Sequence, residues 1–400
     1  MTTFAALVFV RLLLAFSPIP DFLADNHQLT SPLTSFTRLN EGVFLLKNGF
    51  DPYAGELVRH SPAQLVIFST ILPPSKPLFH LIWTLVDALA AWSLSSVWSA
   101  RNKQRNARRE ALIQASYLLN PYLVAPSLAL STSTLDNALC ILTIYFASKG
   151  RPGKALLTLA LLTQSSLYSG LLLFPISLLL RYGPESRLAN PKAVSDWSKL
   201  LRYLAQYAAF MAALALWSTL VMGNLRWIKE TWGATLTVPD LTPNVGLWWY
   251  FFTEMFDHFR NFFLMVFTAL NIIGVVPLTL KFQHDPLYAV YLVIGNVAIF
   301  KSYQTMADPG LFLSFLSIFP EVWSYLRHPL PTVMWHLYAA TLLPLFNNLW
   351  LGQGTGNSNF FYAATLVFGV ANGAAFLDSV WAGLTVPYGE IKQDHSLIQI

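Results

Sequence analysis

Long apolar stretches separated by short polar segments recur along the whole 400-residue chain. A helix needs roughly 17–25 apolar residues to cross a bilayer, and many of the stretches approach that length. In a bilayer only helices and closed barrels satisfy every backbone polar group, and the continuous apolar runs are typical of helices. The pattern predicts an all-α polytopic membrane protein, in which residues 1–400 form a single transmembrane domain of about twelve spans.

The predicted spans follow one another at short intervals. We expect them at 4–16, 78–100, 111–130, 133–148, 155–180, 203–222, 262–280, 286–300, 311–325, 331–351 and 359–381. The stretch 155–180 is too long for one ordinary span and too short for two, and basic loops flank it on both sides. It is therefore predicted to form a short helical hairpin.

The basic residues indicate which side of the membrane each loop faces. The densest group lies in residues 101–109, which contain five Lys and Arg, and cytosolic loops carry such an excess. The first loop, 21–77, is then lumenal, whereas the tail 386–400 and both termini are cytosolic. Within the first loop, residues 33–46 are amphipathic and predict an interfacial helix, which the Asn48-Gly49 turn signal ends.

Composition restricts the class of protein further. Hydrophobic residues make up 54% and charged residues 11% of the chain, and its mean hydropathy is +0.48; soluble domains are about a quarter charged. The net charge of +5 comes from clustered basic loops, which set topology and do not indicate nucleic-acid binding. Cys140 is the only cysteine, so the chain cannot form an internal disulfide or a thiolate metal site.

The strongest candidate site is the aromatic segment 244–263. On one continuous helix, polar side chains share one side and aromatic ones the other. The polar row consists of Tyr250, Glu254, Asp257, His258 and Asn261. Such a helix is expected at the membrane surface, with its polar row facing substrate or protein. The carboxylates and the imidazole have the chemistry of a metal site or an acid–base pair, but the hydrated face of a helix or a partner contact explains them more simply.

Two further polar clusters fall at predicted lumenal ends. One begins at Lys301, for which snorkelling to the membrane surface is the ordinary explanation. The other, 354–359, places Asn357 and Asn359 at a helix start, where Ser358 or Asn359 is expected to cap the helix. The exposed N–H groups there suit a phosphate or a sugar hydroxyl, although an ordinary capped turn fits the spacing better. We expect all three clusters to line one lumen-facing cavity.

Sequence motifs of catalysis are missing. The acids of the first loop are isolated from one another, and no two acidic residues anywhere in the chain are separated by a single residue. Neither a nucleophile elbow, a P-loop nor an H-E-x-x-H motif occurs. No catalytic residue, metal or cofactor is therefore predicted.

Four stretches of this sequence resemble the PIG-U family, a membrane subunit of the glycosylphosphatidylinositol (GPI) transamidase. They are 32–55, 243–263, 299–305 and 356–363, and the second, Pro-Asn-x-Gly-Leu-x-Trp-Tyr-Phe-Phe-x-Glu-Met-Phe-x-His-Phe, is long and unusual. The family usually has Glu where Asp257 stands and Pro where Gln304 stands. The tail 386–400 is not part of the resemblance.

The resemblance implies residence in the endoplasmic reticulum membrane, in a complex that exchanges a C-terminal signal peptide for a GPI anchor. The nucleophilic cysteine of that complex belongs to a separate caspase-like subunit. The family's helical architecture resembles that of lipid-linked mannosyltransferases (the GT-C architecture), although kinship of fold does not carry activity across. The expected role is therefore non-catalytic: to bind and present the GPI lipid.

On this hypothesis the candidate residues divide by ligand. Asn357 and Asn359 contact the lipid headgroup, with Lys301 as a further candidate, and the polar row of 244–263 contacts the glycan or an adjoining subunit. The alternative is a GT-C-type glycosyltransferase that uses a dolichol-phosphate sugar in the lumen, with a first-loop acid such as Asp51 as its base. A transporter is a third class, but it would carry inverted internal repeats, which the sequence does not display.

Overall fold

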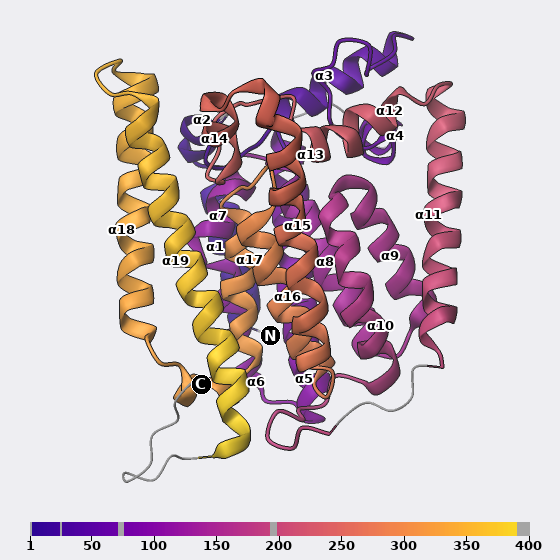
Figure 1. Cartoon of the computed structure of the whole chain (residues 1–400), viewed down its shortest axis with the longest axis vertical. Coiled ribbons are helices and arrows are strands. Elements are labelled where there is room, and N and C mark those ends of the chain that lie inside the picture. Colours follow the sequence, from indigo (N-terminus) through magenta and orange to yellow (C-terminus); the bar gives the residue numbers. More distant parts are fainter. Residues whose placement is uncertain (1, 25, 71–75, 193–197, 390–400) are drawn as a thin grey trace.

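The computed structural model describes residues 2–24, 26–70, 76–192 and 198–389, and every regular element within these ranges is a helix (Figure 1). The all-α prediction is confirmed for these residues. Most of the predicted tail, 390–400, lies outside them.

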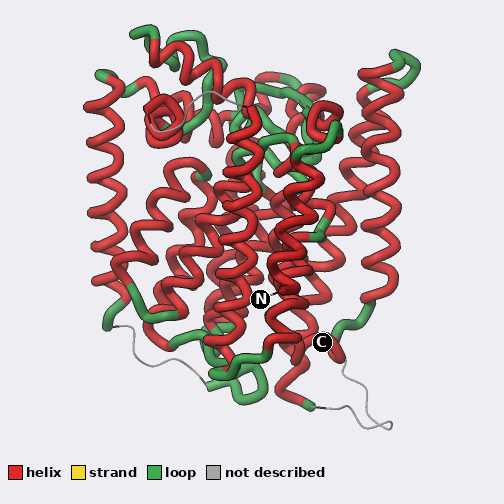
Figure 2. The backbone as a smooth tube through the Cα atoms, turned by 180° about the vertical axis from the view of Figure 1, so that it is seen from behind, coloured by secondary structure: helices red, strands yellow, loops and turns green. Residues whose placement is uncertain are grey.

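The long helices run roughly along one axis, and short helices gather at one end of it (Figure 1). We call this the upper end; it holds α2 (Ile19–Leu23), α3 (Phe36–Lys47), α4 (Pro62–Thr70), α12 (Arg226–Ile228), α13 (Ala234–Thr237) and α14 (Trp248–Glu254). The opposite, lower end holds the loop after α5 (Lys76–Asn102), residues 183–192 and the start of α11 (Leu200–Met222). Figure 2 shows the same layering from behind.

Within the described residues, four helices are long and apolar enough to cross a membrane: α5, α11, α15 (Asp257–Lys281) and the helix from α19 (Ser358–Thr385) through η6 (Val386–Tyr388). Shorter apolar helices accompany them, among them α1 (Thr2–Ala15) and α16 (Pro286–Phe300). α11 buries only Tyr203 and Ser218: one side packs against α9 (Pro152–Ser165), and much of its remaining apolar surface is exposed, as in a helix at the lipid boundary. The fold is that of a helical membrane protein.

The predicted hairpin is confirmed. Residues 152–182 form α9 (Pro152–Ser165), the 3₁₀ turn η1 (Leu167–Leu172) and α10 (Leu173–Tyr182). The chain leaves α8 (Ser133–Ser148) at Lys149, which lines the same lower-end pocket as Lys103. It returns at Glu185, whose carboxylate lies 2.6 Å from the Lys103 ammonium. Both flanks of the hairpin therefore lie at the lower end.

Two predicted single spans are broken. The stretch 111–130 belongs to α6 (Ala107–Leu118) and α7 (Pro121–Leu128), because Asn120 leaves the helical conformation and caps α7 by accepting from the Tyr122 N–H at 3.0 Å. The stretch 311–325 belongs to α17 (Ala307–Phe315) and the 3₁₀ helices η3 (Leu316–Ile318) and η4 (Pro320–Tyr325). Pro320 interrupts it, since proline cannot donate to a continuing helix and restricts the residue before it.

The first loop is docked onto the segment after α11. Asp51 accepts hydrogen bonds from the Tyr53 N–H at 3.0 Å and the Asn224 amide at 3.1 Å, and lies 3.3 Å from the Arg226 guanidinium. Arg59 and Glu230 form a buried ion pair between the same two segments. Gly49, with a φ of +76°, makes the predicted turn after α3.

The centre of the bundle is α16, whose residues 286–296 are all buried. It packs against α10, α15, α17 and α19. Several charged side chains that reach the interior are paired there. Arg11 of α1 donates to Asp87 of α5, which explains how a charge is accommodated in the first apolar run.

Candidate functional site

The aromatic segment at the upper end forms two helices rather than one. α14 is followed by two extended residues, with ψ angles of 153° and 136°, and then by α15. The bend brings the Phe251 ring within 5.0 Å of Phe263 and 4.9 Å of Phe267, between centroids. In one straight helix residues 251 and 267 would stand about 24 Å apart, so this packing requires the bend. The prediction of a continuous helix is therefore wrong.

The bend divides the predicted polar row. Tyr250 and Glu254 remain on α14, whereas Asp257 and His258 begin α15. Glu254, Asp257 and His258 are exposed. The His258 ring lies 3.9 Å from the Phe259 ring, in a position typical of an interfacial side chain. Within the described residues, no group of three or more His, Cys, Asp and Glu side chains is placed to hold a metal ion.

Two of the predicted polar segments do meet, at α14 and the start of α19. The Tyr250 hydroxyl donates to the side-chain oxygen of Asn359, and the Tyr250 and Tyr362 rings lie 4.6 Å apart. Loss of hydration and the nearby Glu254 carboxylate raise the pKa of the Tyr250 phenol, whose hydroxyl is protonated and able to donate at neutral pH even at its ordinary pKa.

Asn357 caps α19, where Ser358 or Asn359 was expected. Its side chain accepts a hydrogen bond from the Phe360 N–H at 3.3 Å. Because the cap is one residue earlier, the Asn359 side chain is available to Tyr250. We call Tyr250, Glu254, Asn357 and Asn359 the upper rim.

An aromatic wall supports the upper rim from within. The buried Trp249 ring stacks on Trp350 of η5 (Asn348–Gly352), with centroids 6.1 Å apart and planes 16° from parallel. Phe361 lies 6.0 Å from both indoles. The rim is therefore fixed on rigid packing, while its polar atoms face outward.

Lys301 does not belong to the upper rim. Its ammonium forms an ion pair with Asp308, and it lines a separate cavity of about 50 Å³ with Asp136 and Ser166. The three predicted clusters thus do not share one cavity: Tyr250 and Asn359 come together, and Lys301 points elsewhere.

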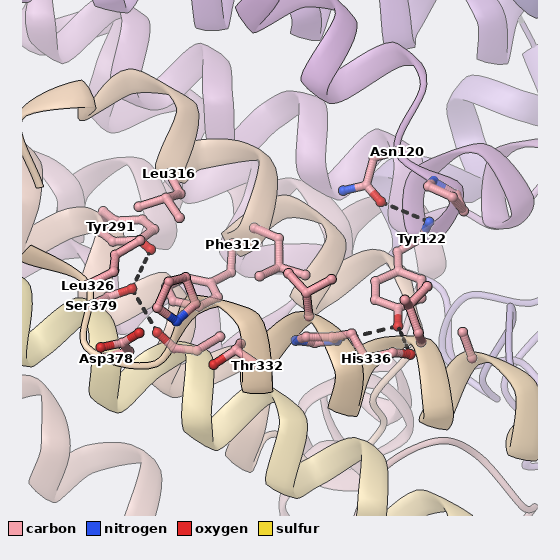
Figure 3. A pocket seen from close by; sticks show the side chains of 17 residues that line it. Asn120, Tyr122, Tyr291, Phe312, Leu316, Leu326, Thr332, His336, Asp378 and Ser379 are labelled. Atoms are coloured by element: carbon pink, nitrogen blue, oxygen red, sulfur yellow. Dashed lines mark hydrogen bonds between the residues drawn. The ribbon is translucent and has the colours of Figure 1, made fainter. Parts of the chain in front are cut away.

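A larger pocket of about 400 Å³ lies between α7, α16, α17, α18 (Pro329–Asn347) and α19 (Figure 3). Its walls are mainly apolar, and most of its polar groups are engaged, whereas His336 Nε2 has no partner among the described groups. Tyr122 donates to the His336 carbonyl at 3.2 Å, and the hydroxyls of Tyr291 and Ser379 lie 2.8 Å apart. Asp378 accepts from the N–H groups of residues 327 and 328. Such a pocket suits hydrocarbon rather than a polar solute.

The pocket is connected to the upper rim through packed side chains. Tyr122 at its upper edge lies 5.5 Å from Phe368, and both belong to one buried cluster with Trp249 and Phe361. Sequence reasoning missed the pocket. Its available signal was the presence of His336 and Asp378 within apolar spans, where polar side chains usually face the protein interior.

The helices and the pocket together define a class: a multi-pass helical membrane protein with an apolar pocket between its helices, beneath a polar rim. Comparison with known proteins identifies the family. The family model for GPI transamidase subunit PIG-U matches residues 5–368. The chain therefore belongs to the PIG-U family, which confirms the resemblance noted in its sequence.

Individual relatives agree across nearly the whole chain. The chain is 33% identical to GPI transamidase component GAB1 of Saccharomyces cerevisiae, over 93% of this chain and 91% of that protein. It is 30% identical to GPI-anchor transamidase component PIGU of Homo sapiens, over 95% of this chain and 92% of that protein. It is 31% identical to the GPI transamidase component GAB1 homolog of Schizosaccharomyces pombe, over 98% of this chain and 95% of that protein. These relatives are components of the GPI transamidase, which supports a role for this chain as a subunit in GPI-anchor attachment.

Proposed function

We propose that this chain is a non-catalytic subunit that binds the GPI lipid and presents it to the transamidase. The observation that carries the proposal is the position of the apolar pocket beneath the upper rim, with a buried aromatic cluster between them. Tyr122 of the pocket packs against Phe368, which is nine residues from Asn359 on α19, so this edge of the pocket lies about 14 Å below the rim. A lipid whose inositol phosphate and glycan contact the rim has its acyl chains at the depth of the pocket.

The chemistry of the rim fits such a headgroup. Asn357 and Asn359 offer amide donors and acceptors for phosphate or sugar hydroxyls, and Tyr250 orients the Asn359 amide. The exposed Glu254, Asp257 and His258 are assigned to the glycan or to an adjoining subunit. Lys301 is better explained by its ion pair with Asp308 than by lipid contact.

The remaining features of the proposal come from the family and the charge pattern. The chain resides in the endoplasmic reticulum membrane, with the upper end in the lumen and both termini in the cytosol. It has about twelve spans in a GT-C-like arrangement, several of them broken or short. The catalytic cysteine belongs to a caspase-like partner subunit.

Substitutions at two asparagines separate lipid contact from helix capping. In cells that lack the endogenous subunit, Asn359→Ala is expected to lower the surface level of a GPI-anchored reporter while the protein level stays normal. Asn357→Ala removes both the amide and the helix cap, and loss of the cap costs about 0.5–2 kcal/mol of stability. Asn357→Ser removes the amide but keeps a capping oxygen. If the Asn357 amide contacts the lipid, both variants lose reporter; if it only caps, Asn357→Ser is normal. Normal reporter levels with Asn359→Ala, Asn357→Ala and Asn357→Ser would remove the headgroup role.

The glycosyltransferase alternative has less support. Asp51, its candidate base, is held by Tyr53, Asn224 and Arg226 in a contact that fixes the first loop. The alternative is tested by sugar transfer from a dolichol carrier with the purified chain alone, and by loss of that transfer on Asp51→Asn.

A further inference from the structure

A second polar pocket lies at the lower end, far from the upper rim. It has a volume of about 470 Å³ and is formed by the C-terminal ends of α5 and α8, the first half of α6 and the loop between α5 and α6. Unlike the apolar pocket, it is lined mainly by polar side chains, including serines of α5 and three basic residues: Lys103, Arg105 and Lys149.

The pocket carries an excess of positive charge. Glu110, the one carboxylate among the described residues that line it, accepts a hydrogen bond from the Ser99 hydroxyl at 2.7 Å. Lys103 also forms an ion pair with Glu185, which lies outside the pocket. Among the described residues, neither Arg105 nor Lys149 is paired with a carboxylate; Lys149 lies 5.9 Å above the Tyr145 ring. Lys103 is offset by Glu185, so Arg105 and Lys149 remain against the single carboxylate of Glu110, beside serine hydroxyls. Such a combination suits a phosphate group.

An apolar track leads along α5 to this pocket. Leu81, Leu85, Leu89 and Trp92 recur at intervals of three or four residues and are each between 37% and 54% exposed. They therefore form one outward stripe on a helix long enough to cross the membrane. Trp92 belongs to both the stripe and the pocket, and its ring lies 5.5 Å from Tyr145. A soluble anion needs only the basic pocket, whereas a lipid uses the stripe as well.

We propose that this pocket binds the phosphate of an anionic phospholipid from the leaflet at the lower end, with an acyl chain along the α5 stripe. Basic pockets between transmembrane helices on the cytoplasmic side are suited to such headgroups. The site is independent of the upper rim, because it lies at the opposite end of α5 and involves neither α14 nor α19.

The test measures the thermal midpoint of the full chain, in its complex, in nanodiscs with an increasing fraction of phosphatidylserine in phosphatidylcholine. Phosphatidylserine is expected to raise the midpoint of the wild type. The triple variant Lys103→Gln, Arg105→Gln, Lys149→Gln should need far more of it, with apparent affinity falling roughly fivefold for each cation removed. Lys192→Gln, Lys199→Gln, Arg202→Gln is the matched control, since it removes the same charges from exposed positions outside the pocket.

Three outcomes would overturn the proposal. One is equal stabilisation by phosphatidylserine in the triple variant and the wild type; another is an equal loss in the control variant, which would indicate diffuse electrostatics. The third is the same stabilisation by inorganic phosphate in pure phosphatidylcholine, which would indicate a site for a free anion. Arg105→Gln alone, at an exposed position, keeps the test available if the triple variant does not assemble.

Discussion

The buried charge cluster around Arg101 and the exposed upper rim use polar side chains in opposite ways. At the lower end, Arg101 is buried and its guanidinium is fully engaged, with hydrogen bonds of 2.9 and 2.7 Å to Asp285 and 2.7 Å to Glu321. At the upper rim, Asn359, Asn357 and Glu254 are exposed, above a buried aromatic wall. Saturated, buried charges hold helices together, whereas exposed polar groups on rigid packing remain available to a ligand. The difference predicts that substitutions in the Arg101 cluster lower the stability of the protein, whereas substitutions in the upper rim weaken lipid recognition.

Removal of Asp285 should have the largest effect on stability. Asp285 also accepts from the backbone N–H groups of Arg187 and Tyr288, so Asp285→Ala leaves Arg101 buried without its main partner. The expected loss is about 3–5 kcal/mol, measured as a fall in the thermal midpoint of the purified protein in detergent.

Glu321→Gln is the matched control, because its carboxylate is 29% exposed and Asp285 remains. It should lower the midpoint much less than Asp285→Ala. Equal and small effects of the two variants would contradict a structural role for the lower-end charges.

Acid should loosen the docked first loop at the upper end. His60 is buried, and neither ring nitrogen has a partner among the described groups. Burial, assisted by Arg38, lowers the pKa of His60 from its ordinary 6.5 to about 3. Above pH 6.5 both folded and unfolded chains hold a neutral ring; below it the unfolded chain alone binds the proton. Stability should therefore fall by about 1.4 kcal/mol per pH unit, or about 2 kcal/mol at pH 5.

His60→Phe removes the titrating group and should flatten this part of the pH dependence. The measurement is the difference in thermal midpoint between pH 7.5 and pH 5 for the two proteins. An undiminished pH dependence in the variant would mean that His60 is not the group responsible.

The smallest effect is expected from the exposed ion pair between Glu56 and Lys229. The two side chains are 65% and 73% exposed, and solvent screens such pairs almost completely. Glu56→Gln should leave the thermal midpoint and the GPI-anchored reporter unchanged. A clear loss of stability would show that exposed charges, and not only buried pairs such as Arg59–Glu230, act structurally, and would weaken the contrast between buried and exposed polar groups.

The sequence predicted the long continuous helices better than the places where helices break. α11 and α15 follow directly from continuous apolar runs, and the basic flanks of 155–180 correctly indicated a hairpin. The break before α7 was also readable, because Asn120-Pro121 is a turn signal. The bend after α14 was not, since it depends on contacts between Phe251 and Phe267 that no local pattern encodes.

The candidate site was predictable in the same partial way. Family resemblance and polarity indicated Tyr250 and Asn359, which the fold brings together. Lys301 was grouped with them because it lies at the same predicted depth, but its partner, Asp308, is set by the fold of the following turn. The apolar pocket is formed by five helices distant in sequence, and its existence depends on how they pack.

The most direct test of lipid presentation is to purify the tagged chain in mild detergent and identify its lipids and proteins by mass spectrometry. We expect the wild type to retain GPI lipid together with the other transamidase components. Asn359→Ala should retain the proteins and lose the lipid. If the wild type carries no GPI lipid, or if Asn359→Ala carries as much as the wild type, the upper rim is not the site at which this subunit holds the lipid.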